Sequence, residues 1–358
     1  MTIPPGADET SVLDTPAITK RDPSSFHRLL ARLPEQARDA WALGKSWPMP
    51  AGFGTPSRVV LLGLGGSAIG ADIVATLARL QSAIPVEVVR QYAAPRLDDR
   101  ALVIASSFSG NTEEPIAAFE GTLGQPGMRI AFTTGGRLAR EARERGAPLL
   151  EYTWDGPPRT ALGYGVFTLL GVLDRLGVLS LSDDDAEAAF DALALATRRY
   201  AIDTPMNEAK RLAIAIGDRV PVIIGPDFLD VAARRFSSEL NENAKQWAFC
   251  TAIPEFNHNA LQALLGPHGT PTMLAPIILD APTVHPRNRR RVQETARMMT
   301  EAGAPPHLVC VDGATPFEAI LHASTLGSWT SYYLAMLHGI DPTPVAALDT
   351  LKERMARD

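Results

Sequence analysis

The sequence predicts a two-lobed α/β protein in which each lobe is a parallel β-sheet flanked by helices, of the doubly wound, flavodoxin-like kind. Short apolar runs without polar alternation are separated by helical stretches, and such runs are typical of strands buried on both faces. Strand–helix alternation requires right-handed crossovers and therefore a parallel sheet. The chain has 358 residues, which is too long for one ordinary lobe and sufficient for two.

The first lobe is expected over residues 51–180. Its predicted strands are 59–62, 86–89, 102–105, 129–132 and 149–152, and its predicted helices are 68–80, 114–123, 138–145 and a closing helix near 162–176. Residues 1–50 are rich in proline and charge, with one amphipathic stretch between Phe26 and Trp41. We expect them to form an N-terminal extension that lies on the body of the protein.

A second, looser copy of this pattern is expected over residues 200–342, after an acidic linker at 182–185 and a helical run to about Arg199. Its predicted strands are 220–224, 273–279 and 308–311, and its predicted helices follow Phe228, follow Arg287 and span 317–337. Residues 343–358 are predicted to form a C-terminal amphipathic helix.

Composition excludes several classes of protein. Apolar and charged fractions of 46% and 21% are those of a globular chain, and a net charge of −6 offers no general attraction for nucleic acid or anionic lipid. The two cysteines, Cys250 and Cys310, lie far apart and are expected to be reduced and buried. No secretion signal and no apolar run of about 18 residues is present, so a cytoplasmic protein without membrane contact is predicted.

A glycine-rich turn, residues 63–70 (GLGGSAIG), follows the first predicted strand and opens the first helix. Ligands of open parallel sheets bind beyond the carboxyl ends of strands, and a helix N-terminus offers free N–H groups to an anion. We therefore expect Gly65, Gly66 and Ser67 to bind phosphate. The segment also fits the GxGxxG/A dinucleotide fingerprint, but Glu87, the candidate acid, falls inside the second strand rather than at its end. A merely tight turn is the third alternative.

A second turn, residues 106–114 (SSFSGNTEE), follows the third strand and also opens a helix. It places three hydroxyls, those of Ser107, Ser109 and Thr112, near a helix N-terminus, which suits a phosphate monoester. The alternative is a capping box with Thr112 or Ser109 as the cap. Capping accounts for one hydroxyl rather than three, so the pattern favours a phosphate site.

Four further segments carry candidate chemistry: GPPRTALGY at 156–164, SSELNENAK at 237–245, PEFNHN at 254–259 and Leu-Lys at 351–352. Together with GGS in the first turn and SxSGNT in the second, they resemble the bifunctional phosphoglucose/phosphomannose isomerases, which belong to the sugar isomerase (SIS) domain proteins. The matches run in the same order from about residue 59 to residue 352. The resemblance implies that both lobes are of SIS type.

The resemblance implies an aldose–ketose isomerase of glycolysis and gluconeogenesis that converts fructose 6-phosphate to glucose 6-phosphate, mannose 6-phosphate or both through a cis-enediolate. It implies Glu242 as the base that moves a proton between C1 and C2, and Arg159 as the cation beside the enediolate. It implies His258 and Lys352 as the ring-opening pair, and a homodimer in which His258 comes from the neighbouring protomer. No metal and no nucleotide cofactor is expected.

Each candidate also has a simpler interpretation. Glu242 could form a helix-surface ion pair with Lys245, and Glu239, three residues earlier, is the competing base. His258 could be an ordinary loop histidine. Arg159 and Lys352 could be surface charges.

Two other functions compete with the isomerase. A non-catalytic sugar-phosphate-binding SIS protein would not need Glu242, His258 and Arg159 together, and such regulators usually carry a DNA-binding module, which we do not find in the sequence. An NAD(P)-binding oxidoreductase would leave the second turn unexplained. The pattern does not identify the residues that distinguish glucose 6-phosphate from mannose 6-phosphate.

Overall fold

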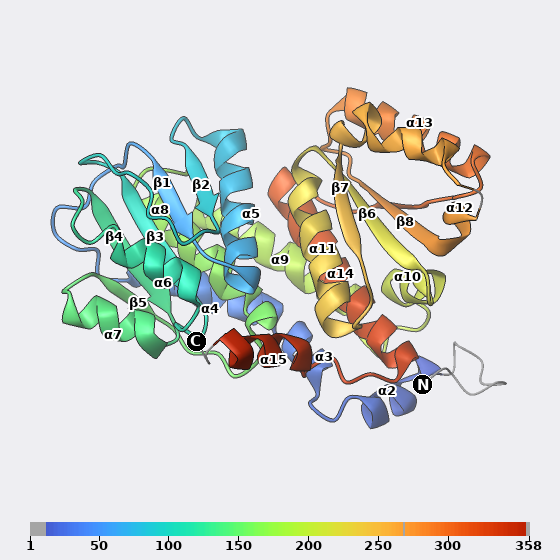
Figure 1. Cartoon of the computed structure of the whole chain (residues 1–358), viewed down its shortest axis with the longest axis horizontal. Coiled ribbons are helices and arrows are strands. Elements are labelled where there is room, and N and C mark those ends of the chain that lie inside the picture. Colours follow the sequence, from blue (N-terminus) through green and yellow to red (C-terminus); the bar gives the residue numbers. More distant parts are fainter. Residues whose placement is uncertain (1–11, 268, 356–358) are drawn as a thin grey trace. The chain divides into compact units, whose positions relative to one another are not determined.

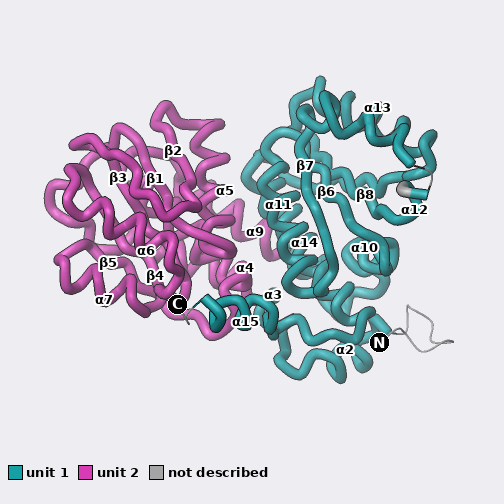
Figure 2. The backbone as a smooth tube through the Cα atoms, in the orientation of Figure 1, with its two compact units in different colours: residues 1–31, 195–358 teal, residues 32–194 magenta. Residues whose placement is uncertain are grey.

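The computed structural model describes residues 12–267 and 269–355. The chain forms two compact units, drawn in different colours in Figure 2: unit 2 comprises residues 32–194, and unit 1 comprises the described residues of 1–31 and 195–358. Each unit contains one parallel sheet flanked by helices (Figure 1), which confirms the predicted fold class. In these described stretches no helix is long and apolar enough to span a membrane.

Unit 2 contains a five-stranded sheet with the order β2-β1-β3-β4-β5. Its strands are β1 Val59–Leu62, β2 Val86–Val89, β3 Leu102–Ser107, β4 Met128–Thr133 and β5 Leu149–Glu151, and its helices include α4 Leu33–Ser46, α5 Gly65–Gln81, α6 Glu113–Glu120, α7 Gly136–Glu144 and α8 Leu169–Arg175. The five predicted strands are therefore confirmed. The closing helix is not continuous: a 3-10 turn (η1, Pro158–Thr160) and a π-helical turn (η2, Tyr164–Thr168) precede α8.

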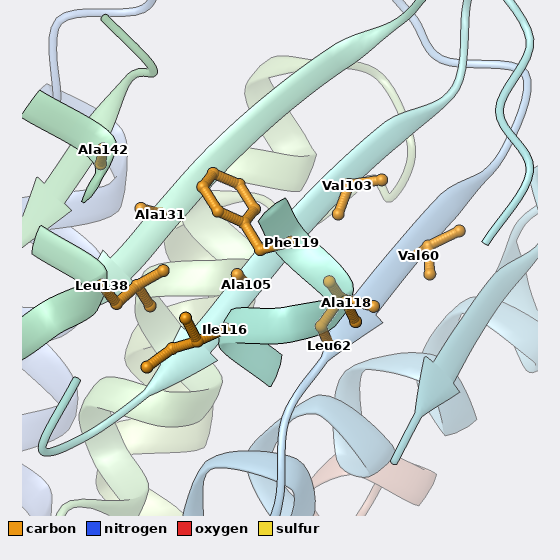
Figure 3. Packing of buried hydrophobic residues seen from close by; sticks show 10 residues of the cluster. All are labelled: Val60, Leu62, Val103, Ala105, Ile116, Ala118, Phe119, Ala131, Leu138 and Ala142. Carbon is orange, nitrogen blue, oxygen red and sulfur yellow. The ribbon is translucent and has the colours of Figure 1, made fainter. Parts of the chain in front are cut away.

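One face of this sheet is covered by α6 and α7 (Figure 3). Alternate strand residues, such as Val60 and Leu62 of β1, meet Ile116 and Phe119 of α6 in a fully buried cluster. Because successive strand residues point to opposite faces and every residue of β1 and β3 is buried, both faces of the sheet are covered. This packing fixes the carboxyl ends of β1 and β3, where the two candidate phosphate turns begin.

Unit 1 contains a four-stranded parallel sheet with the order β7-β6-β8-β9. Its strands are β6 Val220–Pro226, β7 Phe249–Ile253, β8 Leu274–Asp280 and β9 His307–Cys310. Its helices are α2 Thr15–Arg21, α3 Phe26–Ala31, α10 Glu208–Ile216, α11 Asp230–Asn243, α12 Thr270–Met273, α13 Pro286–Glu301, α14 Pro316–His338 and α15 Ala346–Met355, and α9 Asp183–Tyr200 leads into this unit from unit 2. The three predicted strands are present, whereas β7 and α10 were not predicted.

The expected N-terminal extension is divided between the units. Helices α2 and α3 belong to unit 1, and α4 belongs to unit 2. The buried carboxylate of Asp22 accepts hydrogen bonds from the Phe26 amide (2.8 Å) and the Tyr332 hydroxyl (2.9 Å), so it joins α3 to α14. The domain boundaries expected from the sequence, at residues 50, 180, 200 and 342, remain predictions.

The expectation of two buried thiols is wrong for Cys310, which is exposed, while Cys250 is half-buried and both are free. Cys310 lies at the end of β9, an edge strand in which alternate side chains face outward. The edge position explains why an apolar strand pattern does not guarantee burial there.

Candidate active site

The first and second turns lie side by side in unit 2. They follow β1 and β3, which pair in parallel, so both turns leave the same edge of the sheet. The Phe108 amide of the second turn donates a hydrogen bond of 3.0 Å to Ser67 Oγ of the first. A Cβ added at Gly63 would lie 3.1 Å from the Ser106 carbonyl oxygen, so the two backbones are in close contact. The two turns therefore form one structure.

The hydroxyls of the second turn are arranged as a group rather than as caps. Ser107 Oγ donates to Thr112 Oγ1 at 3.1 Å, and Ser109 Oγ accepts from the Asn111 amide at 3.2 Å. Thr112 is the N-cap residue of α6, but its side chain makes no capping hydrogen bond. The capping alternative is therefore wrong for Thr112, and the backbone N–H groups of the first turn of α6 are not capped by it.

A third turn, after β4, supports the second. Gly110 has φ +63°, and a Cβ there would lie 1.8 Å from the Gly135 carbonyl oxygen, so only glycine fits. Thr134 Oγ1 donates to the Phe108 carbonyl oxygen at 2.6 Å, and the Arg137 amide donates to Asn111 Oδ1 at 3.0 Å. These contacts hold the second turn rigidly.

Two tyrosines pack against the same region. The Tyr152 ring lies 6.2 Å from that of Phe108 and stacks on Tyr164 at 4.7 Å between centroids. Burial raises the pKa of both phenols above the ordinary value of a tyrosine. Tyr164 belongs to the segment singled out from the sequence, whereas Tyr152 was considered only as part of a strand.

Arg159 lies in η1 and is buried, with 6% of its surface exposed. A Cβ added at Gly66 would lie 3.1 Å from the Pro158 carbonyl oxygen and 3.3 Å from the Arg159 nitrogen, so η1 packs directly on the first turn. The turn is held by Thr160, whose hydroxyl donates to the Pro157 carbonyl oxygen (2.8 Å) and accepts from Trp154 Nε1 (2.9 Å). The simpler interpretation of Arg159 as a surface charge is therefore wrong.

The geometry of β2 does not fit a dinucleotide site. Glu87 is the second residue of β2 and pairs in register with Val60. Its Oε1 atom lies 3.5 Å from Nη1 of Arg58. It is therefore near the amino end of the strand, whereas the glycine turn is at the carboxyl end. An acid that binds a ribose would have to stand at the carboxyl end.

Glu242 lies near the C-terminal end of α11 in unit 1. It is half-buried and lines a cavity of about 450 Å³. The other lining residues come from the end of α11, the loop after it and the start of α15: Asn241, Lys245, Gln246, Trp247 and residues 344–348. Lys245, in a left-handed conformation (φ +54°), donates to the carbonyl oxygens of Glu242 (2.7 Å) and Pro342 (3.1 Å), and so joins the end of α11 to the segment before α15.

Glu239, the competing base, has a different environment. Its side chain is 4% exposed and accepts hydrogen bonds from Arg235 on α11 (2.7 Å) and from the Ser328 hydroxyl on α14 (2.8 Å). One turn further along α11, Asn243 Nδ2 donates to Ser331 Oγ at 2.9 Å. These bonds fix the register of α11 on α14, and they hold the Glu239 carboxylate in a buried ion pair.

His258 ends a 3-10 turn, η4 (Glu255–His258), that follows β7. Its side chain is exposed and lines a second cavity of about 220 Å³, to which Glu242 does not contribute. Helix α11 starts beyond the carboxyl end of β6 and returns to the amino end of β7, while His258 follows the carboxyl end of β7. Glu242 and His258 therefore lie at opposite edges of the sheet, separated by a five-residue strand of roughly 16 Å.

Lys352 lies on α15, a helix without buried residues among those described. Its side chain is 77% exposed, and Nζ lies 3.7 Å from Asp349 Oδ1. Lys352 does not line the cavity that contains Glu242. Across residues 12–267 and 269–355, no group of three or more His, Cys, Asp or Glu residues is placed to hold a metal ion.

Solved structures share the architecture of this chain. A hypothetical protein from Thermus thermophilus aligns with a TM-score of 0.71 and 16% identity, covering 92% of this chain and 89% of that one. The C-terminal domain of glucosamine-fructose-6-phosphate aminotransferase from Francisella tularensis aligns with a TM-score of 0.67 and 14% identity, over 88% and 96% of the two chains. Residues 205–355 match the bacterial phospho-glucose isomerase C-terminal SIS domain, so the fold is that of the SIS proteins.

Curated relatives define the family. The bifunctional phosphoglucose/phosphomannose isomerase of Caldicellulosiruptor bescii is 33% identical over 90% of this chain and 97% of its own length. The enzyme of the same name from Aquifex aeolicus is 30% identical over 85% and 92%. The chain belongs to the bifunctional phosphoglucose/phosphomannose isomerase family, and the family predicted from the sequence is confirmed.

Proposed function

We propose that this protein interconverts glucose 6-phosphate and mannose 6-phosphate with fructose 6-phosphate through a cis-enediolate. The observation that carries the proposal is the pair of joined turns in unit 2. They bring together four hydroxyls and two helix N-termini, and the buried Arg159 segment packs against the first turn. Family membership supports the same reaction, because the curated relatives are named for these two isomerisations.

We propose that the joined turns bind the 6-phosphate of the sugar. Helices α5 and α6 begin at this edge, and the free N–H groups and partial positive charge of a helix N-terminus favour an anion. In a chain with a net charge of −6 such local donors are needed. The proposed phosphate-binding residues are Gly65, Gly66, Ser67, Ser107, Ser109 and Thr112.

Removal of one hydroxyl tests this site. Thr112→Ala is expected to raise KM about tenfold to a hundredfold, which corresponds to the ~1.5–3 kcal/mol of a hydrogen bond to a charged group. The matched control is Thr315→Ala at the N-cap of α14, which removes a capping hydroxyl outside the site and should leave KM unchanged. An unchanged KM in Thr112→Ala would remove the second turn from the phosphate site.

We propose that Glu242 takes the proton from C2 of the aldose and returns it to C1, and that Arg159 stabilises the enediolate between the two transfers. His258 and Lys352 open the ring, by moving a proton between O1 and the ring oxygen. The exposure of Glu242 to a cavity, against the buried pairing of Glu239, supports the choice of base.

We propose that the active form is a homodimer in which His258 serves the active site of the neighbouring protomer. Glu242 and His258 lie at opposite edges of one sheet, which argues against a single chain supplying both to one sugar. A cytoplasmic location also remains a prediction.

A coupled assay tests the reaction directly. With fructose 6-phosphate as the substrate, we expect both glucose 6-phosphate and mannose 6-phosphate to form, each detected by its own dehydrogenase-linked readout. After dialysis against EDTA the rates are expected to stay the same, because Arg159 supplies the positive charge beside the enediolate. Absence of both aldoses would overturn the proposed function, and a loss of rate restored by zinc or manganese would overturn the metal-independent mechanism.

A further inference from the structure

The turn that carries His258 is anchored on both sides of the histidine, although the histidine itself is exposed. On one side, Phe256 is buried in a core cluster with Ile253 and Val292. On the other side, Asn259 Nδ2 donates to Glu255 Oε1 at 2.8 Å, across the same turn. An exposed ring on a fixed turn loses little conformational freedom when it meets a substrate.

The remaining anchor is the side chain of Asn257, directly before His258. Asn257 Nδ2 donates a hydrogen bond of 2.7 Å to Thr295 Oγ1 on α13. Asn257 Oδ1 is buried and has no hydrogen-bond partner within the described chain. Among the residues that the structure describes, Thr295 is therefore the side chain that holds this amide by a hydrogen bond.

Thr295 occupies an apolar position. It is 1% exposed, and its neighbours on the buried face of α13, Val292, Ala296 and Met299, are hydrophobic. A valine has nearly the shape of threonine, so packing alone does not require a hydroxyl there, and a buried hydroxyl without a partner would be unfavourable. The hydrogen bond to Asn257, the residue before His258, explains why position 295 carries a hydroxyl.

We propose that Thr295 is a positioning residue for ring opening, which acts through Asn257 to fix the turn that presents His258. This inference rests on the proposed role of His258 as a ring-opening residue. Thr295 does not touch the sugar; its hydroxyl restricts the Asn257 side chain and thereby the orientation of the next residue. Its removal should affect ring opening and spare the proton transfer between C1 and C2.

The test compares two substrates with the full-length protein. Fructose 6-phosphate is mostly a closed furanose, whereas an analogue without the 5-hydroxyl cannot form that ring and needs no ring opening. Thr295→Val is expected to lower kcat on fructose 6-phosphate about tenfold, the upper range for one neutral hydrogen bond, and to change the rate on the open-chain analogue little. Thr295→Ser, which keeps the hydroxyl, should restore the rate on fructose 6-phosphate.

Two further variants separate positioning from general damage. Thr300→Val removes a hydroxyl of the same helix that donates to the Ala296 carbonyl oxygen rather than to Asn257, and it should not discriminate between the substrates. Asn257→Leu removes the same hydrogen bond from its other partner, the half-buried Asn257, and must show the same selective loss as Thr295→Val. If Thr295→Val does not fold, Asn257→Leu tests the inference in its place.

The outcomes are distinct. Suppose that His258→Ala lowers kcat on fructose 6-phosphate but not on the open-chain analogue. If Thr295→Val and Asn257→Leu then lower kcat equally on both substrates, or on neither, the positioning role of Thr295 is wrong. If His258→Ala itself affects both substrates equally, the ring-opening role of His258 is wrong and this inference fails with it. Selective loss in all three variants supports the inference.

Discussion

Glu242→Gln is expected to lose kcat by at least about 10²–10⁴-fold, with KM for fructose 6-phosphate nearly unchanged. The amide keeps the shape and the hydrogen-bonding capacity of the side chain but cannot accept the C2 proton, so the loss falls on the chemical step. Exchange of the C2 hydrogen of glucose 6-phosphate with deuterated water, followed by NMR, should stop in the same variant. Exchange at the normal rate would show that another group is the base.

The control for this variant is Glu239→Gln, three residues earlier on α11. Its carboxylate is buried against Arg235 and Ser328, so the amide removes the negative charge that pairs with the buried Arg235 guanidinium. Breaking such a pair costs roughly 3–5 kcal/mol of stability. We therefore expect a lower midpoint of thermal unfolding, with proton exchange retained in the fraction that is folded. Together the two variants separate the catalytic carboxylate from the structural one.

The strands of unit 2 could be predicted because they are apolar on both faces. Each residue of β1 and β3 is buried, so an uninterrupted apolar run is required there. Strand β7 has the opposite character: it is an edge strand, and its first residue, Phe249, is 52% exposed. Its sequence, Phe-Cys-Thr-Ala-Ile, is short and mixed, so the pattern gives no clear strand signal.

The phosphate turns of the candidate site could be predicted because their signal is local in the sequence. The glycines and hydroxyls of the two turns are adjacent in sequence, and their position after a strand is enough to predict that they meet. The bond between Asn257 and Thr295 joins residues 38 apart in the chain, and a threonine in the middle of a helix carries no sequence signal of its role. Likewise, only the packing of α11 on α14 distinguishes Glu239 from Glu242, since both lie in the same sequence segment.

Mixing two inactive variants tests which protomer supplies His258. If Glu242 and His258 act in one site but come from different chains, Glu242→Gln and His258→Ala homodimers each lack one group in both sites. Subunit exchange at equal concentrations makes half of the dimers mixed, and one of the two sites in a mixed dimer then has both groups intact. Activity should rise to about a quarter of the wild-type value.

The control for this experiment is a mixture of Glu242→Gln with the double variant Glu242→Gln/His258→Ala, in which neither chain supplies the Glu242 carboxylate. Every site in such a mixed dimer lacks the Glu242 carboxylate, so the mixture should stay inactive under conditions in which the first mixture recovers. The topology of unit 1 is the reason for expecting this contrast, because α11 ends at the amino edge of the sheet and the turn with His258 follows the carboxyl edge. If dimers exchange, as followed by mass spectrometry, and the first mixture still shows no activity, both groups come from one chain and the sharing of His258 between protomers is wrong.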